Sequence, residues 1–255
     1  MTSTWRHQLE LLYELVLRDM RLRYKRSVLG ILWSLFNPLL QLLVFYFIFA
    51  LVLPLNIPNF ALFLFIGLLA WNWFQSSLFE ATGSIVDNGD LIRRPGFSST
   101  ILPVVPVTTN FIHFLIALPI LLVALWWSGV PFNPWSVALP LVLAGQFVVT
   151  LSLSYVVAAL NVGFRDVRYL LGIILLLGFY LTPVFYEPTS IPAPYRVLYY
   201  LNPLVILIQS YRNLLLYDTS VPIFALLLVV AAGLVTLWLG VRMFKRMSVH
   251  FAEEL

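Results

Sequence analysis

The stretch Leu29–Leu53 reads LGILWSLFNPLLQLLVFYFIFALVL and contains no charged residue. An α-helix rises 1.5 Å per residue, so a helix over this stretch is longer than the ~30 Å hydrocarbon core of a bilayer. The stretch therefore predicts a helix that crosses a membrane.

The rest of the chain repeats this pattern. Of the 255 residues, 61% are hydrophobic and 10% are charged, and the mean hydropathy is +0.94. A soluble domain carries about 25% charged residues, so a fold that faces water on all sides is excluded. Five further apolar runs predict spans near Phe60–Phe79, Val104–Trp127, Val137–Leu160, Tyr169–Tyr186 and Pro222–Met243. The predicted fold is an all-α membrane protein with six transmembrane helices (29–243) in a single domain.

The segment ahead of the first span predicts an amphipathic helix. Between Trp5 and Arg26, apolar and charged residues form separate stripes at spacings of three and four residues. The apolar stripe contains Leu9, Leu12, Val16 and Met20, and the charged stripe contains Glu10, Glu14, Arg18, Arg21 and Lys25. Such a helix lies in the membrane interface with its basic residues near anionic headgroups. We expect residues 1–28 to form this interfacial helix, and a solvated cytosolic helix is the alternative.

Loop charge predicts the orientation of the chain. If the N-terminus is cytosolic, Arg196 and Arg212 fall outside, and the other thirteen of the fifteen lysines and arginines fall inside. Cytosolic loops carry the excess of basic residues. We therefore expect both termini, including the tail 244–255, to be cytosolic in a multi-pass protein of the bacterial plasma (inner) membrane.

One segment does not fit a simple count of spans. Val197–Leu216 is fairly apolar but contains Asn202-Pro203, Gln209 and Arg212. A seventh span here would place the basic C-terminal tail outside, against the charge asymmetry. We therefore predict a re-entrant or interfacial helical segment on the outer side, where irregular backbone is covered by protein or faces a water-filled cavity.

The sequence lacks the residues with which a transporter powers itself. A phosphate-binding loop ends in Gly-Lys-Ser/Thr, but the two lysines, Lys25 and Lys245, follow Tyr24 and Phe244. Ion-coupled carriers keep ionisable groups at membrane depth. The carboxylates fall in predicted loops, tails or span ends, and His113 lies among apolar neighbours typical of a packed residue. We therefore expect an external motor.

Sites for other chemistry are equally sparse. The absence of cysteine excludes disulfides, thiolate nucleophiles and cysteine metal sites. Asp87 and Asp90 flank Asn88-Gly89 and are typical of a solvated loop, although a catalytic pair in a membrane enzyme is the alternative. The basic residues are spread over short loops, which argues against a nucleic-acid partner. We predict no catalytic residue and no metal site.

Two long motifs carry a family resemblance. Arg18–Pro38, RDMRLRYKRSVLGILWSLFNP, resembles the N-terminal signature of ABC-2 type permeases for polysaccharide export. Asn161–Arg168, NVGFRDVR, with Tyr180–Tyr186, YLTPVFY, resembles the loop between spans four and five and the start of the outer gate of that family. Asn202-Pro203 is a third, weaker match. The resemblance runs from about residue 9 to residue 246.

The resemblance implies the role of the chain and its partners. The family includes exporters of O-antigen, teichoic acid and related lipid-linked polysaccharides. Its permeases form homodimers that bind two copies of a separate ATPase. The chain would then be a transporter subunit rather than an enzyme, surrounded by membrane lipids and binding no cofactor itself, with ATP and Mg on the partner subunit.

The resemblance also assigns residues that would contact the ATPase. Ser84–Arg94 resembles the family's coupling helix, and we refer to it as the coupling segment. The residues expected to contact the ATPase there and in the next cytosolic loop are Ile85, Asp87, Leu91, Arg93, Arg94, Arg165 and Asp166. The alternative for Arg165 and Asp166 is a membrane-edge anchor beside a carboxylate at a helix N-terminus.

Two further sets of residues are expected to meet the substrate. Aromatic faces suit sugar C–H groups, and the family packs these spans around its dimer channel. The expected path residues are Trp33, Tyr46, Trp71, Trp73, Phe74 and Tyr180. The residues expected near the lipid pyrophosphate are Arg21, Arg23, Lys25 and Arg26. Ordinary helix packing is the alternative for each aromatic residue. An exporter of a drug or small lipid, a glycan-modifying enzyme and a scaffold remain alternative functions.

Overall fold

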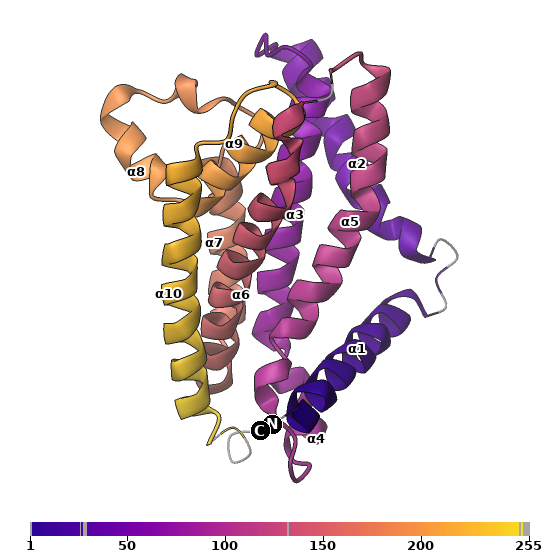
Figure 1. The fold of residues 1–255 in the computed structure, drawn as a ribbon, viewed down its shortest axis with the longest axis vertical. Coiled ribbons are helices and arrows are strands. Elements are labelled where there is room, and N and C mark those ends of the chain that lie inside the picture. Colours follow the sequence, from indigo (N-terminus) through magenta and orange to yellow (C-terminus); the bar gives the residue numbers. More distant parts are fainter. Residues whose placement is uncertain (1, 26, 28–29, 132, 250, 252–255) are drawn as a thin grey trace.

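The computed structural model describes residues 2–25, 27, 30–131, 133–249 and 251, and every regular element within them is helical (Figure 1). The α-helices are α1 (Thr2–Tyr24), α2 (Trp33–Tyr46), α3 (Phe60–Gly83), α4 (Gly89–Ile92), α5 (Val104–Trp127), α6 (Leu139–Gly163), α7 (Val167–Leu181), α8 (Arg196–Tyr200), α9 (Pro203–Leu215) and α10 (Ile223–Met247). A π-helix, η2 (Phe47–Val52), continues α2. The short 3-10 helices are η1 (Gly30–Leu32), η3 (Val86–Asn88), η4 (Ser99–Ile101), η5 (Pro134–Ala138), η6 (Pro188–Ser190) and η7 (Ala193–Tyr195). The prediction of an all-α fold is confirmed for the described residues.

Five helical stretches in the described residues are long and apolar enough to cross a membrane. They are Trp33–Val52, Phe60–Gly83, Ser99–Trp127, Pro134–Gly163 and Ile223–Met247. The remaining predicted span, Tyr169–Tyr186, corresponds to α7, which has 15 residues and is about 22 Å long. α7 ends at Leu181, before the predicted end at Tyr186, because Pro183 disfavours a helical conformation at Thr182.

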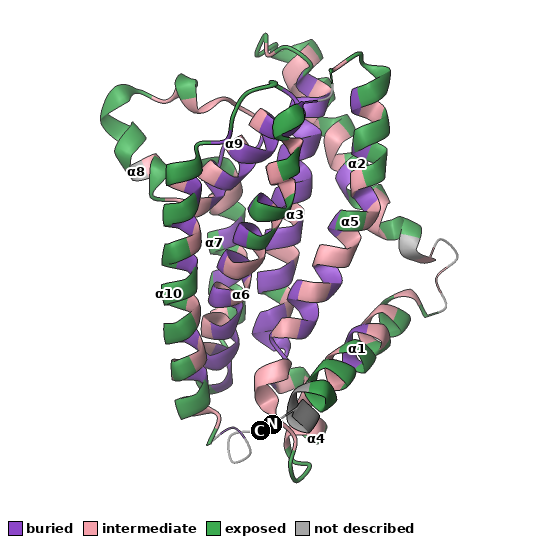
Figure 2. Ribbon diagram, in the orientation of Figure 1, coloured by how far each residue is buried: buried purple, intermediate pink, exposed green. Residues whose placement is uncertain are grey.

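α3 is the central helix of the bundle (Figure 2). In its most apolar window 78% of the residues are buried, against 6% for the stretch that begins with α2. α3 contacts α2, α5, α6, α7 and α9, and Phe63, Leu64 and Leu68 are fully enclosed. A helix surrounded on all sides has apolar residues around its whole circumference, as the sequence of α3 does.

α6 and α10 pack together through small residues. An added Cβ at Gly233 would lie 3.1 Å from Val148, and one at Gly240 would lie 3.1 Å from the backbone oxygen of Ser152. Glycine therefore brings the two helices to close backbone approach, as is common where helices associate in membranes.

α1 runs obliquely at the end of the bundle where α10 terminates (Figure 1). Leu15 and Val16 are buried in a second core that also contains Ile85 and Phe244. Within the predicted apolar stripe, Val16 is buried in this core and Leu9 is half exposed. α1 is thus attached to the bundle along part of its apolar face.

A buried arginine fastens the segment 182–216 to α3. Arg212 of α9 is 2% exposed, and its guanidinium donates hydrogen bonds to the backbone oxygens of Pro183 (2.7 Å), Val184 (2.7 Å) and Phe63 (3.2 and 3.3 Å). The same group lies 3.3 Å from the centre of the Phe63 ring. We call this arrangement the Arg212 clamp. The sequence places Arg212 in an outer re-entrant segment, and the structure adds that backbone oxygens satisfy this cation inside the protein.

Gly67 makes room for the Arg212 clamp, and replacing it tests the clamp. A Cβ at Gly67 would lie 2.6 Å from the backbone oxygen of Val184 and 2.8 Å from Arg212. Because backbone cannot move aside easily, we expect Gly67→Ala to lower the free energy of unfolding by about 1–3 kcal/mol.

Gly172→Ala is the matched control, because the nearest atom to its added Cβ is 4.0 Å away, on Phe79. It should be neutral or stabilising, since alanine favours a helix more than glycine does. Thermal unfolding of the two variants in detergent measures the difference. Equal unfolding temperatures would contradict the clamp.

Candidate functional site

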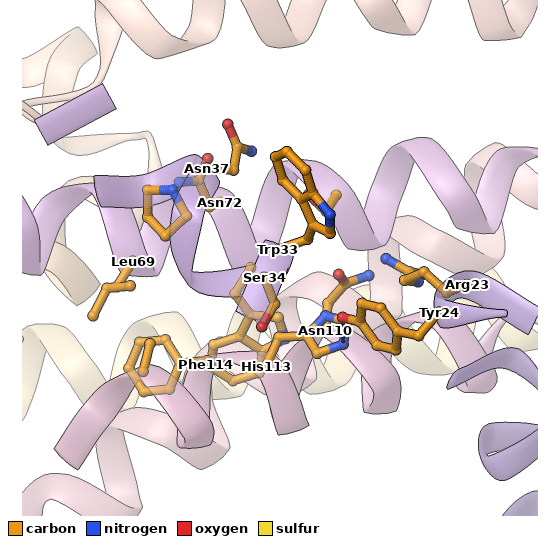
Figure 3. Close-up of a pocket in the computed structure, with 14 residues that line it drawn as sticks. Arg23, Tyr24, Trp33, Ser34, Asn37, Leu69, Asn72, Asn110, His113 and Phe114 are labelled. Atoms are coloured by element: carbon orange, nitrogen blue, oxygen red, sulfur yellow. Dashed lines mark hydrogen bonds between the residues drawn. The ribbon is translucent and has the colours of Figure 1, made fainter. Parts of the chain in front are cut away.

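A cavity of about 270 Å³ with a mixed polar and apolar lining lies between α1, α2, α3 and α5 (Figure 3). Its lining contains Arg23, Tyr24, Trp33, Ser34, Asn37, Pro38, Leu69, Asn72, Trp73, Ser76, Asn110, His113, Phe114 and Ala117. Polar side chains are costly inside a membrane protein and gather there for function. We call this space the α1–α5 cavity and treat it as the candidate functional site.

Glu80 holds the charged end of the cavity together. Arg23 of α1 donates to both carboxylate oxygens of Glu80, at 2.9 and 2.6 Å, and to Asp19 at 3.3 Å. The amide of Asn110 donates to the same carboxylate at 2.7 Å. Burial lowers the pKa of Arg23, and the hydrogen bond and charge of Glu80 more than offset this, so the pKa is raised above its usual value. Arg23 is therefore a permanent cation that is already paired.

A second contact joins α1 to α5. The Tyr24 hydroxyl lies 2.8 Å from Nε2 of His113, and the two rings meet edge to face with centres 5.9 Å apart. Figure 3 shows Tyr24, Asn110 and His113 gathered below Trp33. The interpretation of His113 as a packed residue holds only in part, because its ring also forms this hydrogen bond and lines the cavity.

The rest of the polar lining is uncharged. It consists of the Asn37 and Asn72 amides, the Ser34 and Ser76 hydroxyls and the Trp33 indole. The Asn72 amide donates to Gln41 of α2 at 2.9 Å. Neutral amides and hydroxyls beside an aromatic ring suit a ligand rich in hydroxyl groups. In the described residues, no group of three or more His, Cys, Asp or Glu side chains could hold a metal ion.

The predicted aromatic path residues lie in separate places. Trp33 and Trp73 line the α1–α5 cavity. Trp71 and Phe74 line a cavity of about 290 Å³ between α3, α6 and α7, and Tyr46 lines another of about 400 Å³ beside Phe60. One copy of the chain therefore does not bring all six residues into a single site.

Burial also separates these aromatic residues. Trp71 and Trp73 are each 2% exposed, and Phe74 is buried as well. Trp71 donates through its indole to Gln75, and Trp73 donates to the backbone oxygen of Val107 at 3.3 Å. Trp33, Tyr46 and Tyr180 are exposed and are the members of the set that can meet a ligand directly.

A row of aromatic rings runs from the bundle core to the segment after α7. Trp71 meets Phe179, with ring centres 5.8 Å apart, and Phe179 meets Phe185 at 5.8 Å. Phe185 meets Tyr186 at 5.0 Å, whose hydroxyl lies 2.9 Å from that of Tyr199. Tyr180 flanks the row through Phe179, at 5.4 Å. The sequence reasoning identified Tyr180 and Trp71 but missed the rings that connect them.

The expected ATPase contacts are mostly on the surface. Asp87, Arg93, Arg94, Arg165 and Asp166 are exposed, and Leu91 is partly buried. Ile85 is fully buried in the core shared with α1, so it supports the coupling segment from within.

The coupling segment is also tied to α1. Arg18 donates to the side-chain oxygen of Asn88 at 2.6 Å, and Ile85 shares a core with Leu15 and Val16. The position of this segment therefore depends on α1.

The expected headgroup cations differ in their availability. Arg21 and Lys25 line a shallow groove on α1 with Glu14 and Arg18, and both are exposed. Arg23 is paired with Glu80. Arg26 lies outside the described residues. Glu80 and Asn110, which the sequence reasoning missed, had one signal, namely that Glu80 is the single carboxylate in the long apolar helix α3.

Comparison with known proteins shows similarity along nearly the whole chain. Residues 10–216 match the family described as ABC-2 type transporter. The O-antigen export system permease protein RfbA of Myxococcus xanthus is 36% identical over 252 residues, covering 96% of this chain and 95% of that protein. A protein of the same description from Klebsiella pneumoniae is 34% identical over 247 residues, covering 96% and 95%. The polysialic acid transport protein KpsM of Escherichia coli is 26% identical over 241 residues, covering 91% of each.

Glu80→Gln tests the attachment of α1. Without the carboxylate the half-buried Arg23 loses its strongest partner, which costs on the order of 1–3 kcal/mol. We expect faster amide hydrogen exchange in residues 2–24, measured by mass spectrometry. Glu10→Gln removes an exposed carboxylate from α1 itself and should leave amide exchange in this helix unchanged. If residues 2–24 exchange at the same rate in the Glu80→Gln and Glu10→Gln variants, Glu80 does not hold α1 against the bundle.

Proposed function

Because the chain belongs to the ABC-2 type transporter family, we propose that it is the permease subunit of an ATP-driven exporter that moves lipid-linked polysaccharide across the plasma membrane. The cargo is of the O-antigen or teichoic-acid type. The observation that carries this proposal is the similarity to O-antigen export permeases over 96% of the chain. The mixed aromatic and neutral polar lining of the α1–α5 cavity supports a sugar cargo.

The proposed topology has six passes and cytosolic termini. The five long apolar stretches supply five passes, and α7 supplies the sixth although it is about 22 Å long. α8 and α9 lie at the end opposite the start of α1 (Figure 1) and form the outer re-entrant segment. The distribution of basic residues supports this orientation, since the exposed Arg93, Arg94 and Arg165 fall on the proposed cytosolic side.

The proposed motor is a separate ATPase. Two copies of this chain pair with two copies of the ATPase, which holds ATP and Mg. The exposed Asp87, Arg93 and Arg94 of the coupling segment and Arg165 and Asp166 of the next loop contact it. Closure of the ATPase pair pushes the coupling segment and opens the bundle. The hydrogen bond between Arg18 and Asn88 supports a role for α1 in this movement.

The proposed glycan path lies between the two copies. α2 and α7 expose broad apolar and aromatic faces, which include Trp33 and Tyr180. The glycan moves past these rings toward the aromatic row that ends at Tyr199, and the segment Pro188–Leu216 gates the outer mouth. Trp71, Trp73 and Phe74 stay part of this proposal as the buried walls behind the exposed rings, and Tyr46 belongs with Trp33 and Tyr180 to the exposed rings.

The lipid carrier is proposed to approach along α1 from the cytosolic leaflet. The exposed Arg21 and Lys25, together with Arg26, stand near its pyrophosphate. Arg23 instead positions the neighbouring Tyr24 at the α1–α5 cavity through its pairing with Glu80.

Complementation of a deletion strain tests the function and the aromatic path together. Expression of the wild-type chain should restore glycan at the cell surface. Without the chain, lipid-linked glycan should remain on the cytosolic side of the membrane. We expect Tyr180→Ala and Trp33→Ala to lower export about two- to tenfold, since an aromatic contact contributes on the order of 0.5–1.5 kcal/mol. Trp127→Ala, at an 82% exposed position, is the control and should export normally.

Trp71 and Trp73 are buried, so their variants are interpreted separately in the same assay. Trp71→Ala and Trp73→Ala should also lower export, but each leaves a core cavity that costs about 3–5 kcal/mol. Only variants present at wild-type protein level are compared. Normal surface glycan in the Tyr180→Ala, Trp33→Ala double variant would overturn the path, and normal glycan in the deletion strain would overturn the function.

Charge reversal tests the ATPase contact. We expect Arg93→Glu/Arg94→Glu to reduce co-purification of the ATPase tenfold or more, because like charges brought together at an interface cost several kcal/mol. Arg196→Glu reverses an exposed charge in α8, at the opposite end of the bundle (Figure 1), and should leave co-purification unchanged. Equal recovery of the ATPase with all variants would remove the coupling segment from the interface.

A further inference from the structure

A groove of about 680 Å³ runs between α6 and α10, and it shares no lining residue with the α1–α5 cavity. Its walls are formed by Leu153 and Val156 of α6 and by Leu239 and Met243 of α10. Gly240 forms part of its floor, where α10 meets the backbone oxygen of Ser152. The groove therefore follows the two helices, and these four side chains give it apolar walls.

Two arginines close one end of the groove. Arg242 and Arg246 both line it and both are exposed. They are four residues apart, so they lie on the same face of α10 one turn apart. Among the described carboxylates none forms an ion pair with either of them, since the ion pairs there both belong to Arg23.

The arginine end of the groove lies at headgroup depth. Arg242 is 19 residues beyond Ile223 in α10, which corresponds to about 28 Å along the helix, close to the thickness of the hydrocarbon core. Its guanidinium lies 4.7 Å from the centre of the Trp238 ring. Tryptophan and arginine together are typical of the membrane–water interface.

We propose that this groove binds an anionic phospholipid of the cytosolic leaflet. The phosphate lies between Arg242 and Arg246, and an acyl chain lies along Leu153, Val156, Leu239 and Met243. Basic pockets between membrane helices on the cytosolic side bind acidic headgroups, and the like charges of the two arginines favour a shared anion. The assignment rests on the proposed orientation of α10 and not on the identity of the transported cargo.

Native mass spectrometry of the full-length chain in mild detergent tests the proposal. Phosphatidylglycerol and phosphatidylcholine are added in equal amounts, and bound lipid is counted. We expect the wild-type chain to retain phosphatidylglycerol in preference to phosphatidylcholine. The Arg242→Ala/Arg246→Ala variant should retain at least roughly tenfold less phosphatidylglycerol, since each basic residue strengthens binding to acidic lipid. Arg242→Lys/Arg246→Lys keeps both charges and should retain most of the binding.

Lys245→Ala is the matched control. Lys245 lies on the same turn of α10 and is exposed, but it does not line the groove, so its loss should not change bound phosphatidylglycerol. Val156→Trp fills the groove without changing charge and should reduce binding as well. An equal loss with Lys245→Ala and with the arginine variants would mean diffuse surface charge and would overturn the site.

Two other results would also overturn the proposal. One is unchanged phosphatidylglycerol binding in Arg242→Ala/Arg246→Ala. The other is displacement of the lipid by inorganic phosphate at millimolar concentration, which would show an anion site without the acyl groove. Export by these variants is measured separately by complementation, so failure of the lipid site and failure of the proposed function are distinguished.

Discussion

The end of the molecule that contains α8 and α9 depends on the Arg212 clamp. A buried cation is costly unless hydrogen bonds satisfy it, and no carboxylate in the described part of the chain forms an ion pair with Arg212. It donates instead to the backbone oxygens of Phe63, Pro183 and Val184. Two of these oxygens follow the end of α7, where helical hydrogen bonds have ceased. The planar, forked guanidinium can reach all three at once, which a lysine could not do.

The clamp covers the backbone that follows the short helix α7. Pro183 ends α7, and irregular backbone at membrane depth is tolerated only where protein covers it. α9 supplies that cover, with Leu207 and Ile208 fully buried against the bundle. Counting apolar residues predicted the five long passes correctly because length and hydropathy are local properties. It misjudged the end of α7, although Pro183 is a local signal for that end. It did not show the contacts of Arg212, because Arg212 and Phe63 are 149 positions apart in the chain.

The distinction between local sequence properties and tertiary contacts also applies to the candidate site. The sequence identified aromatic residues by type, but their placement follows from helix geometry and tertiary packing. Trp71 and Trp73 are two residues apart, so they point about 200° apart around α3 and line different cavities. Helical spacing alone could have predicted this. The pairing of Arg23 with Glu80 could not be predicted, because α1 and α3 meet only through the tertiary fold.

α1 connects the coupling segment to the α1–α5 cavity. Arg18 reaches Asn88 in the middle of the coupling segment, whereas Arg23 and Tyr24 reach Glu80 and His113 at the cavity. Arg18, Arg23 and Tyr24 belong to one continuous helix, α1. A helix transmits displacement along its length because its backbone hydrogen bonds hold it rigid, so the coupling segment and the wall of the cavity cannot move independently while these contacts persist. The polar contacts that appear costly in an apolar chain are therefore the ones that join its proposed cytosolic surface to its interior.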